Sequence, residues 1–379
     1  MKITIIGGGI AGLTTALSLN KLGFDCEVFE RAKQLNEVGA GIWMQPNALK
    51  VLDWLGLGEL VRESGTLLDQ VDITNSQLIP IKKTKQEVVQ DEKGNKIVAI
   101  HRATLQKILY EAIPKGIVNL GYEFKSLEQN ENQVKISFGG REIMSDLVIG
   151  ADGINSKVRD NIFSNSSKRF SGQTCWRGIS DIRLPDEFQN AGIESWGKKI
   201  RFGFSQVTEN QVYWFAVKNA SQNGTDNILT IKAELKNYFS DFNSLVLNII
   251  EHTNGEKIIR NDISDLKRLD KWHKDKVVLV GDAAHATTPN MGQGAGQGME
   301  DAYYLANILA KHNQIEQALS LFESNRREKV DYVVNNSWIF GQMAHNGFGQ
   351  IVMKIIMKLT PDKVMKQQMN KLYSIQEKF

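Results

Sequence analysis

Three glycines near the N-terminus, Gly7-x-Gly9-x-x-Gly12, constrain the fold of this chain more than any other feature. The β-branched run at residues 2–6 ends at the first of them and predicts a short buried strand, and apolar spacing predicts a helix over about 10–21. Gly7 allows a tight turn, Gly9 lets the backbone approach a pyrophosphate, and Gly12 allows the helix to pack closely on the strand. The N–H groups and positive dipole at the helix N-terminus would then face the phosphates.

A second strand is predicted over 24–29, and Glu30 follows it at the position from which a carboxylate can accept hydrogen bonds from an adenosine ribose. Strand, glycine turn, helix, strand and acidic residue occur in the order that a dinucleotide-binding unit requires. The turn itself does not distinguish NAD from FAD, because both use it.

Composition sets the broad class of protein. The chain has 379 residues, which favours two or three domains; 41% of them are apolar and 23% charged, as in ordinary globular proteins. A net charge of +3 without a basic patch gives no reason to expect nucleic acid. Cys26 and Cys175 cannot form a disulfide framework, so we expect a cytoplasmic protein. No apolar run approaches the roughly 18 residues of a spanning helix, so stable membrane insertion is not expected.

Two further apolar runs end in a glycine and an aspartate. A predicted strand at 147–149 leads into Asp152, and another at 277–280 leads into Asp282. In a parallel sheet, ligands bind beyond the carboxyl ends of the strands, where both aspartates would lie. A glycine-rich run at 292–298 then precedes a predicted helix at 299–311 and can approach an extended ligand closely.

With these motifs in order, the chain resembles the class A flavoprotein monooxygenases, the single-component FAD group that includes para-hydroxybenzoate hydroxylase. The three signatures are Gly7-x-Gly9-x-x-Gly12, Asp152-Gly153-x-x-Ser156-x-x-Arg159 and Gly281-Asp282. The resemblance covers nearly the whole chain and implies bound FAD, with NADPH or NADH as the reductant.

The resemblance also implies roles for individual residues. Glu30 would bind the FAD ribose, Arg102 the diphosphate region, and Asp282 the ribityl chain or pyrophosphate; Asp152 and Arg159 are candidates for recognising the reductant. The loop at 292–296 would lie along the flavin ring. The full set of expected cofactor-binding residues is Gly7, Gly9, Gly12, Glu30, Arg31, Gly41, Arg102, Asp152, Arg159, Asp282, Pro289, Gly292, Gln293, Gly294, Ala295 and Gly296.

On the substrate side, residues 38–42 and 45–48 resemble the urate hydroxylase group within this family. Arg201 and Tyr213 align with two active-site residues of that group, and we expect Arg201 to stabilise an anionic oxygen while Tyr213 orients it. The aspartate that follows the Gly-Asp motif in that group is Asn290 here, so urate is not the expected substrate. No metal site is expected.

The expected fold is α/β: a Rossmann-like FAD-binding domain, an inserted, mostly antiparallel β-sheet substrate domain, and C-terminal helices. Short alternating runs, including residues 87–90, predict strands of the inserted sheet. The FAD-binding domain is assigned to residues 1–68, 101–172 and 268–325, the substrate domain to 69–100 and 173–267, and the helical segment to 326–379. Lysines at 354, 358, 363, 366 and 371 predict a solvated face, with a membrane-surface helix as the alternative.

The resemblance implies insertion of one oxygen atom from O2 into a small aromatic, heteroaromatic or polycyclic substrate through a flavin C4a-hydroperoxide. Two alternatives stay open at this stage, a flavin-dependent reductase of the geranylgeranyl reductase type and an epoxidase of an alkene. A flavin halogenase is less favoured, because the sequence lacks that class's Trp-x-Trp-x-Ile-Pro motif. The expected partners are the small-molecule substrate and O2, and the expected state is a monomer or a homodimer.

Overall fold

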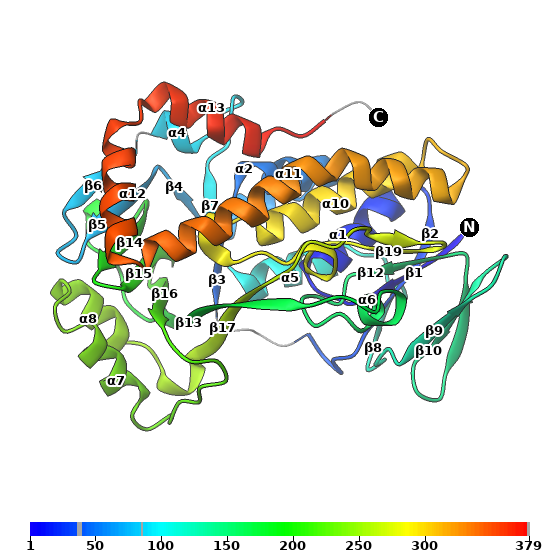
Figure 1. Ribbon diagram of the computed structural model, residues 1–379, viewed down its shortest axis with the longest axis horizontal. Helices are drawn as coiled ribbons and strands as arrows, with labels where there is room; N and C mark the ends of the chain where they lie inside the picture. Colours follow the sequence, from blue (N-terminus) through cyan, green and yellow to red (C-terminus); the bar gives the residue numbers. More distant parts are fainter. Residues whose placement is uncertain (36–39, 85, 377–379) are drawn as a thin grey trace.

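The computed structural model describes residues 1–35, 40–84 and 86–376, and the statements below concern these residues (Figure 1). Val38 and Gly39 of the segment noted above lie outside them. Among the described residues, a six-stranded sheet has the order β18-β19-β12-β1-β2-β8. All its neighbours pair in parallel except β18 with β19. Its strands are β1 (Lys2–Ile6), β2 (Asp25–Glu30), β8 (Val118–Leu120), β12 (Leu147–Gly150), β18 (His273–Lys274) and β19 (Val277–Leu279).

Helices pack on this sheet around a core of aliphatic side chains. The first two strands and the helix between them follow the sequence prediction to within one residue. α1 and α10 lie side by side, and Gly298 of α10 faces Ala11 of α1, where a Cβ on the glycine would be 3.0 Å from the alanine Cβ. The helices of this part are α1 (Ile10–Lys21), α2 (Pro46–Leu55), α3 (Gly58–Glu63), α5 (Arg102–Glu111), α6 (Lys157–Ile162), α9 (Asp282–His285) and α10 (Gly294–Leu309).

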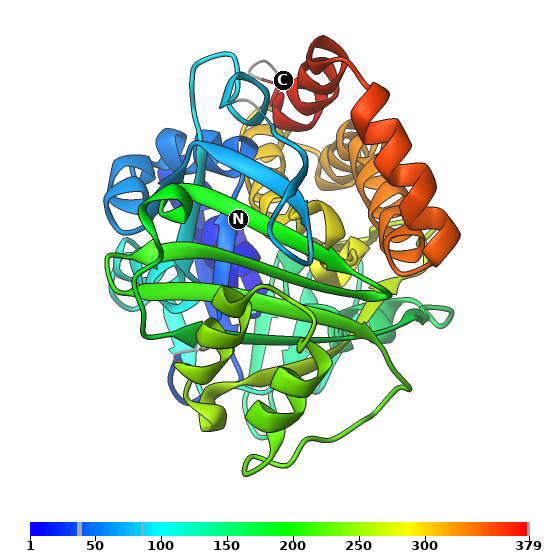
Figure 2. The same ribbon diagram turned by 90° about the vertical axis from the view of Figure 1, so that its left-hand side faces the viewer.

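A seven-stranded sheet of order β17-β13-β16-β15-β14-β5-β6 forms a second layer (Figure 2). Its pairs are antiparallel except β14 with β5. One face packs Phe202, Phe204 and Trp214 against α7 (Ile231–Tyr238) and α8 (Ser244–Glu251). The predicted α/β fold with an inserted, mostly antiparallel sheet is therefore confirmed. The strands are β5 (Gln70–Asn75), β6 (Pro80–Lys82), β13 (Lys168–Ser180), β14 (Ala191–Gly197), β15 (Ile200–Thr208), β16 (Gln211–Asn219) and β17 (Ile259–Leu266).

Smaller elements complete the described part of the chain. β3 (Gly41–Met44), β7 (Ile97–His101) and β4 (Thr66–Leu68) form one small antiparallel sheet, and β9 (Ser126–Gln129), β10 (Val134–Ser137) and β11 (Glu142–Ser145) form another. The chain ends in three helices, α11 (Ile315–Ala344), α12 (Gly347–Leu359) and α13 (Asp362–Tyr373). In the described ranges, no helix is both long and apolar enough to cross a membrane.

Two local predictions are wrong. Residues 87–90, expected to be a strand, lie mostly in the short helix α4 (Gln86–Val89), because a run of four residues does not distinguish the two periodicities. The helix expected at 299–311 begins earlier, at Gly294, so the glycine-rich run supplies its first turn rather than a loop before it.

Candidate cofactor and substrate site

Four motifs meet at the carboxyl edge of the six-stranded sheet. Glu30 closes β2, and β1, β12 and β19 run in parallel with it toward Gly7, Asp152 and Asp282. The sequence pattern predicted that these residues would share one edge, and the strand pairing places them there. We call them the cofactor edge, together with the first turns of α1 and α10.

The N-terminal glycine turn leaves no room for side chains at two of its three positions. Gly7 has a φ of 111°, and a Cβ there would lie 2.4 Å from the carbonyl oxygen of Ala151. A Cβ on Gly12 would lie 2.0 Å from the Gly7 carbonyl oxygen. At Gly9, by contrast, an added Cβ meets no described atom within 4 Å, so the backbone at the start of α1 is open to a close approach. This is the arrangement that a pyrophosphate needs.

Glu30 is tied to the same turn. Its carboxylate accepts hydrogen bonds from the backbone N–H of Gly8 (2.6 Å) and of Ala32 (2.9 Å). The Gln106 side chain donates to the Gly8 carbonyl (3.0 Å). These contacts fix the carboxylate beside the glycine turn, while a carboxylate retains lone pairs for ribose hydroxyls. The next residue, Arg31, is exposed.

The second glycine-rich run forms the N-terminus of α10. Gly292 has a φ of 63°, a left-handed conformation that glycine adopts without strain, and Gly294, Ala295 and Gly296 make the first helical turn. The Gln293 side chain accepts a hydrogen bond from Asn47 Nδ2 (2.9 Å), which connects the turn to α2. Because α1 and α10 start at the same end, two helix N-termini converge at the cofactor edge.

A buried ionic cluster supports the Gly281-Asp282 turn from behind. Asp301 accepts hydrogen bonds from the Gly281 N–H (2.8 Å), His285 Nε2 (2.6 Å) and Arg326 Nε (2.8 Å). Arg326 also pairs with Glu300 at 2.6 Å. Burial alone would raise the pKa of Asp301, but the charges and hydrogen bonds of His285 and Arg326 lower it to about 2. His285 therefore has a structural partner, and the sequence pattern gave no sign of Arg326.

Asp282 and Arg102 both reach the surface at this edge. Their side chains are exposed, whereas their neighbours Ala283 and Ala284 are buried. The protein around Asp282 nevertheless displaces enough water to raise the pKa of its carboxyl group, although the charges of His285 and Arg102 act in the opposite direction. Pro289 is exposed as well, and Gly292 follows it in the turn before α10.

The Asp152 motif makes internal contacts. The Asp152 carboxylate accepts hydrogen bonds from Ser156 Oγ (2.5 Å) and the Lys157 N–H (2.7 Å), and so caps α6. Arg159 is buried and donates to the carbonyl oxygens of Ala283 (3.2 Å) and Ile154 (3.0 Å). The motif thus joins the ends of β12 and β19, and its expected role toward the reductant remains a prediction.

The inner face of the seven-stranded sheet lies toward the cofactor edge. We use this name for the side chains of Glu194, Trp196, Arg201, Gly203, Ser205, Tyr213 and Phe215, which alternate with the outward-facing core residues. Trp43 Nε1 of β3 donates to Ser205 Oγ at 2.8 Å. A Cβ on Gly41 would lie 2.3 Å from the Tyr213 ring, so only glycine lets β3 pass this close to the face.

Arg201 lies at the centre of a polar cluster that is largely removed from water. Its side chain is 2% exposed; Nη1 pairs with Glu194 at 2.9 Å and Nη2 donates to Asn290 Oδ1 at 2.7 Å. Asn290 in turn donates to the Ser337 carbonyl of α11 at 2.9 Å. Among the described residues no acceptor lies within hydrogen-bonding distance of Arg201 Nε, although this group is buried. One donor of a buried guanidinium is therefore free.

Tyr213 and Arg201 have different partners in this structure. The two residues lie on one face, but Tyr213 pairs with Ser205, four residues along β15 and thus about 13 Å from Arg201. Burial raises the pKa of Tyr213 to about 12, although the positive charge of Arg177 on β13 and a hydrogen bond with Arg177 act in the opposite direction. Arg201, by contrast, pairs with Glu194 on β14. The expectation that both side chains act on one oxygen atom therefore remains a prediction.

Comparison with known proteins agrees with this site. The family described as "FAD binding domain" matches residues 1–337, so the chain belongs to that family. Its fold and relatives are those of the class A flavoprotein monooxygenases, and the chain is an oxidoreductase of this kind that binds FAD.

Two curated relatives match almost end to end. The chain is 34% identical over 367 residues to the aurachin C monooxygenase/isomerase of Stigmatella aurantiaca, covering 95% of this chain and 94% of the relative. It is 30% identical to the 2-heptyl-3-hydroxy-4(1H)-quinolone synthase of Pseudomonas aeruginosa, covering 90% and 89%. Among solved structures, Klebsiella pneumoniae HpxO with FAD and uric acid has the same fold, with a TM-score of 0.90, 24% identity and coverage of 98% and 96%.

Proposed function

We propose that this protein uses NAD(P)H and O2 to insert one oxygen atom into a heteroaromatic ring that carries an oxygen substituent and an apolar chain, as in a 4-quinolone. The observation that carries the proposal is the Arg201–Glu194–Asn290 cluster on the inner face, with its free Nε donor. The name of one curated relative supports the ring class, because that relative is a 2-heptyl-3-hydroxy-4(1H)-quinolone synthase.

The cluster suits a neutral or singly charged ring better than a polyanion. Glu194 offsets the charge of Arg201, and the rest of the inner face offers aromatic and small side chains such as Phe215 and Gly203. Phe340 lies near the guanidinium, with 5.9 Å between the Arg201 Cζ and the ring centroid. Arg201 Nε is enclosed in this structure, so a ring oxygen would reach it only after the side chains that cover it move aside. The hydrogen bond would then stabilise negative charge on that oxygen and raise the nucleophilicity of the adjacent carbon.

The cofactor edge would hold FAD through the open backbone at Gly9, the carboxylate of Glu30, and the N-termini of α1 and α10. The flavin, when bound, supplies the electron transfer from NAD(P)H and the activation of O2. The protein groups would orient the substrate ring, and the aromatic side chains of the inner face would exclude water from the space between ring and cofactor.

Replacement of Arg201 tests the proposal. FAD-loaded Arg201→Gln is expected to keep its flavin and to form product from a 2-alkyl-4-quinolone about tenfold more slowly, because the donor fork is lost. Arg201→Lys keeps the positive charge beside Glu194 but lacks the planar set of N–H donors, and should form product at a similarly reduced rate. Arg183→Gln is the matched control. Arg183 lies between β13 and β14, and its ion pair with Glu209 is exposed to solvent. Normal product formation by both Arg201 variants would overturn the assignment.

The same assay separates the remaining alternatives. Consumption of NAD(P)H with reduction of a carbon–carbon double bond and no uptake of O2 would identify a reductase. An epoxide formed from an alkene, with the ring compounds inert, would identify an epoxidase. Either result would replace the proposed hydroxylation.

A further inference from the structure

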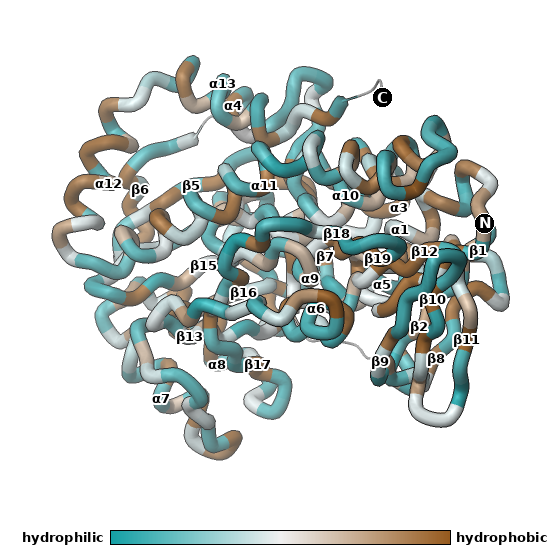
Figure 3. Tube along the Cα trace, turned by 45° about the vertical axis from the view of Figure 1, so that its right-hand side comes forward, coloured by the Kyte–Doolittle hydropathy of each residue, from teal (hydrophilic) through white to brown (hydrophobic). Residues whose placement is uncertain are grey.

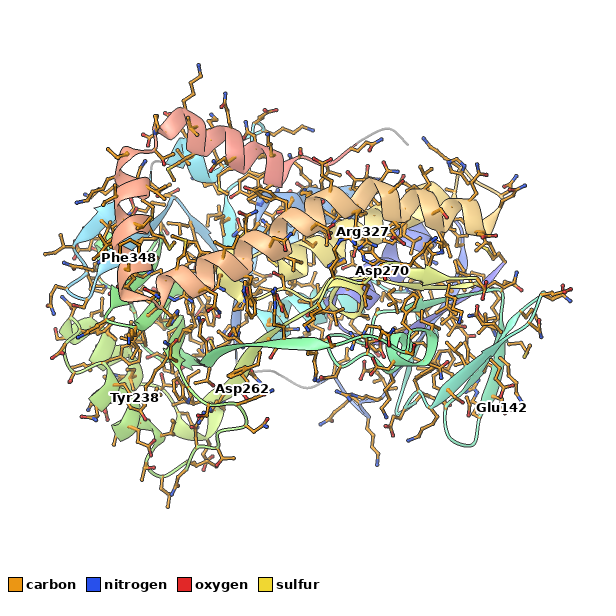
Figure 4. The ribbon with its side chains drawn as sticks, in the orientation of Figure 1. Glu142, Tyr238, Asp262, Asp270, Arg327 and Phe348 are labelled. Carbon is orange, nitrogen blue, oxygen red and sulfur yellow. The ribbon has the colours of Figure 1, made fainter. Side chains whose placement is uncertain are left out.

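The C-terminal helix α12 carries an exposed apolar stripe. Five of its side chains are more than half exposed, among them Phe348 at 77% and Leu359 at 75%. At about 100° per residue they fall within one arc of roughly 140° on the helix. Figure 3 shows the hydrophobic colour along this helix, and Figure 4 places Phe348 at the outer end of the molecule. The five residues, which we call the α12 stripe, are Phe348, Ile351, Ile355, Ile356 and Leu359.

The opposite side of α12 is occupied by the protein itself. Gly349, Gln350 and Met353 are buried, and Gln350 Nε2 donates to the Gly197 carbonyl at 2.9 Å. Met353 packs with Trp196, whose indole N–H is bonded to Glu194. The helix is therefore fixed in place by its inner side, and the stripe cannot turn inward to bury itself.

Basic residues border the stripe. Lys354 and Lys358 lie along one edge of it at helical spacing, and three more lysines follow in α13. Between residues 344 and 373 the sequence has five lysines and one acidic residue, Asp362. Asp362 is paired with Lys82 of β6 at 3.4 Å, so its charge is offset within the protein.

We propose that the α12 stripe docks this protein on the surface of an anionic lipid bilayer. A stripe of apolar side chains with lysines along one edge matches the boundary between acyl chains and acidic headgroups. A second copy of the chain fits less well, because a symmetric contact would bring the two lysine rows together without acidic partners. The helix would lie in the interface without spanning it. This proposal does not depend on the identity of the oxygenated substrate.

Vesicle binding by the full-length, FAD-loaded protein tests the proposal without any turnover. The protein should co-sediment with vesicles of phosphatidylcholine and phosphatidylglycerol, and less with phosphatidylcholine alone. Phe348→Ser/Ile355→Ser/Leu359→Ser should bind about a hundredfold more weakly, because three apolar side chains leave the interface. Lys354→Gln/Lys358→Gln should bind the anionic vesicles about tenfold more weakly and with less dependence on salt.

Ile228→Ser/Leu229→Ser is the matched control, because these side chains are 61% and 91% exposed but lie before α7, where the nearby Lys232 is paired with Glu251. It should bind vesicles like the unmodified protein. Failure of the unmodified protein to co-sediment, or equal binding by the triple serine variant, would overturn the proposal. Absence of vesicle binding together with a concentration-dependent dimer that the triple variant abolishes would assign the stripe to self-association instead.

Discussion

The cofactor edge and the inner face differ in the part of the chain that forms them. The cofactor edge is formed mainly by the backbone, because glycines at 7, 9 and 12 set its shape and helix N-termini offer N–H groups. On the inner face the side chains define the site, and Arg201, Glu194 and Asn290 come from β15, β14 and the turn before α10, respectively. A backbone site suits an invariant ligand such as FAD, whereas a side-chain site can change its substrate by single substitutions.

The largest effect is expected behind the cofactor edge. Arg326→Met should lower the free energy of unfolding by about 3–5 kcal/mol, because it leaves Glu300 and Asp301 buried without their main cation. Chemical denaturation measures this loss. Arg268→Met removes a pair with Asp331 that is open to solvent and should cost less than about 1 kcal/mol. Equal losses in the two variants would show that the buried cluster has no special role in the edge.

A backbone substitution tests the edge itself. Gly9→Ala should weaken FAD binding by about a hundredfold while leaving the stability of the protein nearly unchanged, because its Cβ meets no described protein atom but stands where the pyrophosphate would approach. Flavin fluorescence titration measures the affinity. Gly347→Ala, also without a neighbour within 4 Å, is the control. Unaltered FAD affinity in Gly9→Ala would place the cofactor elsewhere.

The region of the inner face should respond to pH through His345, which follows α11 and whose Nε2 lies 3.4 Å from the Val217 carbonyl oxygen of β16. Burial, followed by the charge of Arg201, lowers the pKa of His345 to about 3, below the ordinary value near 6.5. Between these values the unfolded chain binds a proton that the folded chain does not, so stability falls as the pH drops below 6.5. From pH 7.5 to pH 5 the free energy of unfolding should fall by about 2 kcal/mol more than in His345→Asn. Parallel pH profiles for the two proteins would contradict the buried neutral imidazole.

The smallest effect is expected at the junction of the two regions. Trp43→Phe removes the hydrogen bond to Ser205 and should cost about 1 kcal/mol of stability, with FAD affinity unchanged. Denaturation and flavin titration of the same variant measure both quantities. A large loss of FAD affinity would mean that the two regions are not separate in the way described.

The two regions also differ in how far they follow from the sequence. The first part of the cofactor edge is local, because β1, the glycine turn, α1 and β2 lie within 30 residues. The sequence pattern also predicted that Gly7, Glu30 and Asp282 would lie at strand ends of one sheet, and the strand pairing confirms those positions. The inner face depends on register between strands. Arg201 was predicted from the sequence, and its role toward the substrate remains a prediction. Its partner Glu194 was missed, although the tight turn at Lys198-Lys199 pairs Trp196 with Arg201 and brings Glu194 to the same face. Arg326 was missed because its partners are 25 and 26 residues away on another helix.

The origin of the inserted atom tests the central claim most directly. The FAD-loaded protein would be supplied with NADPH or NADH, isotopically labelled O2 and a 2-alkyl-4-quinolone, and the product analysed by mass spectrometry. Our account predicts a product that carries one labelled oxygen atom, formed in step with the uptake of O2. A product labelled from water, or oxidation of NAD(P)H that yields only hydrogen peroxide with every ring compound offered, would contradict it.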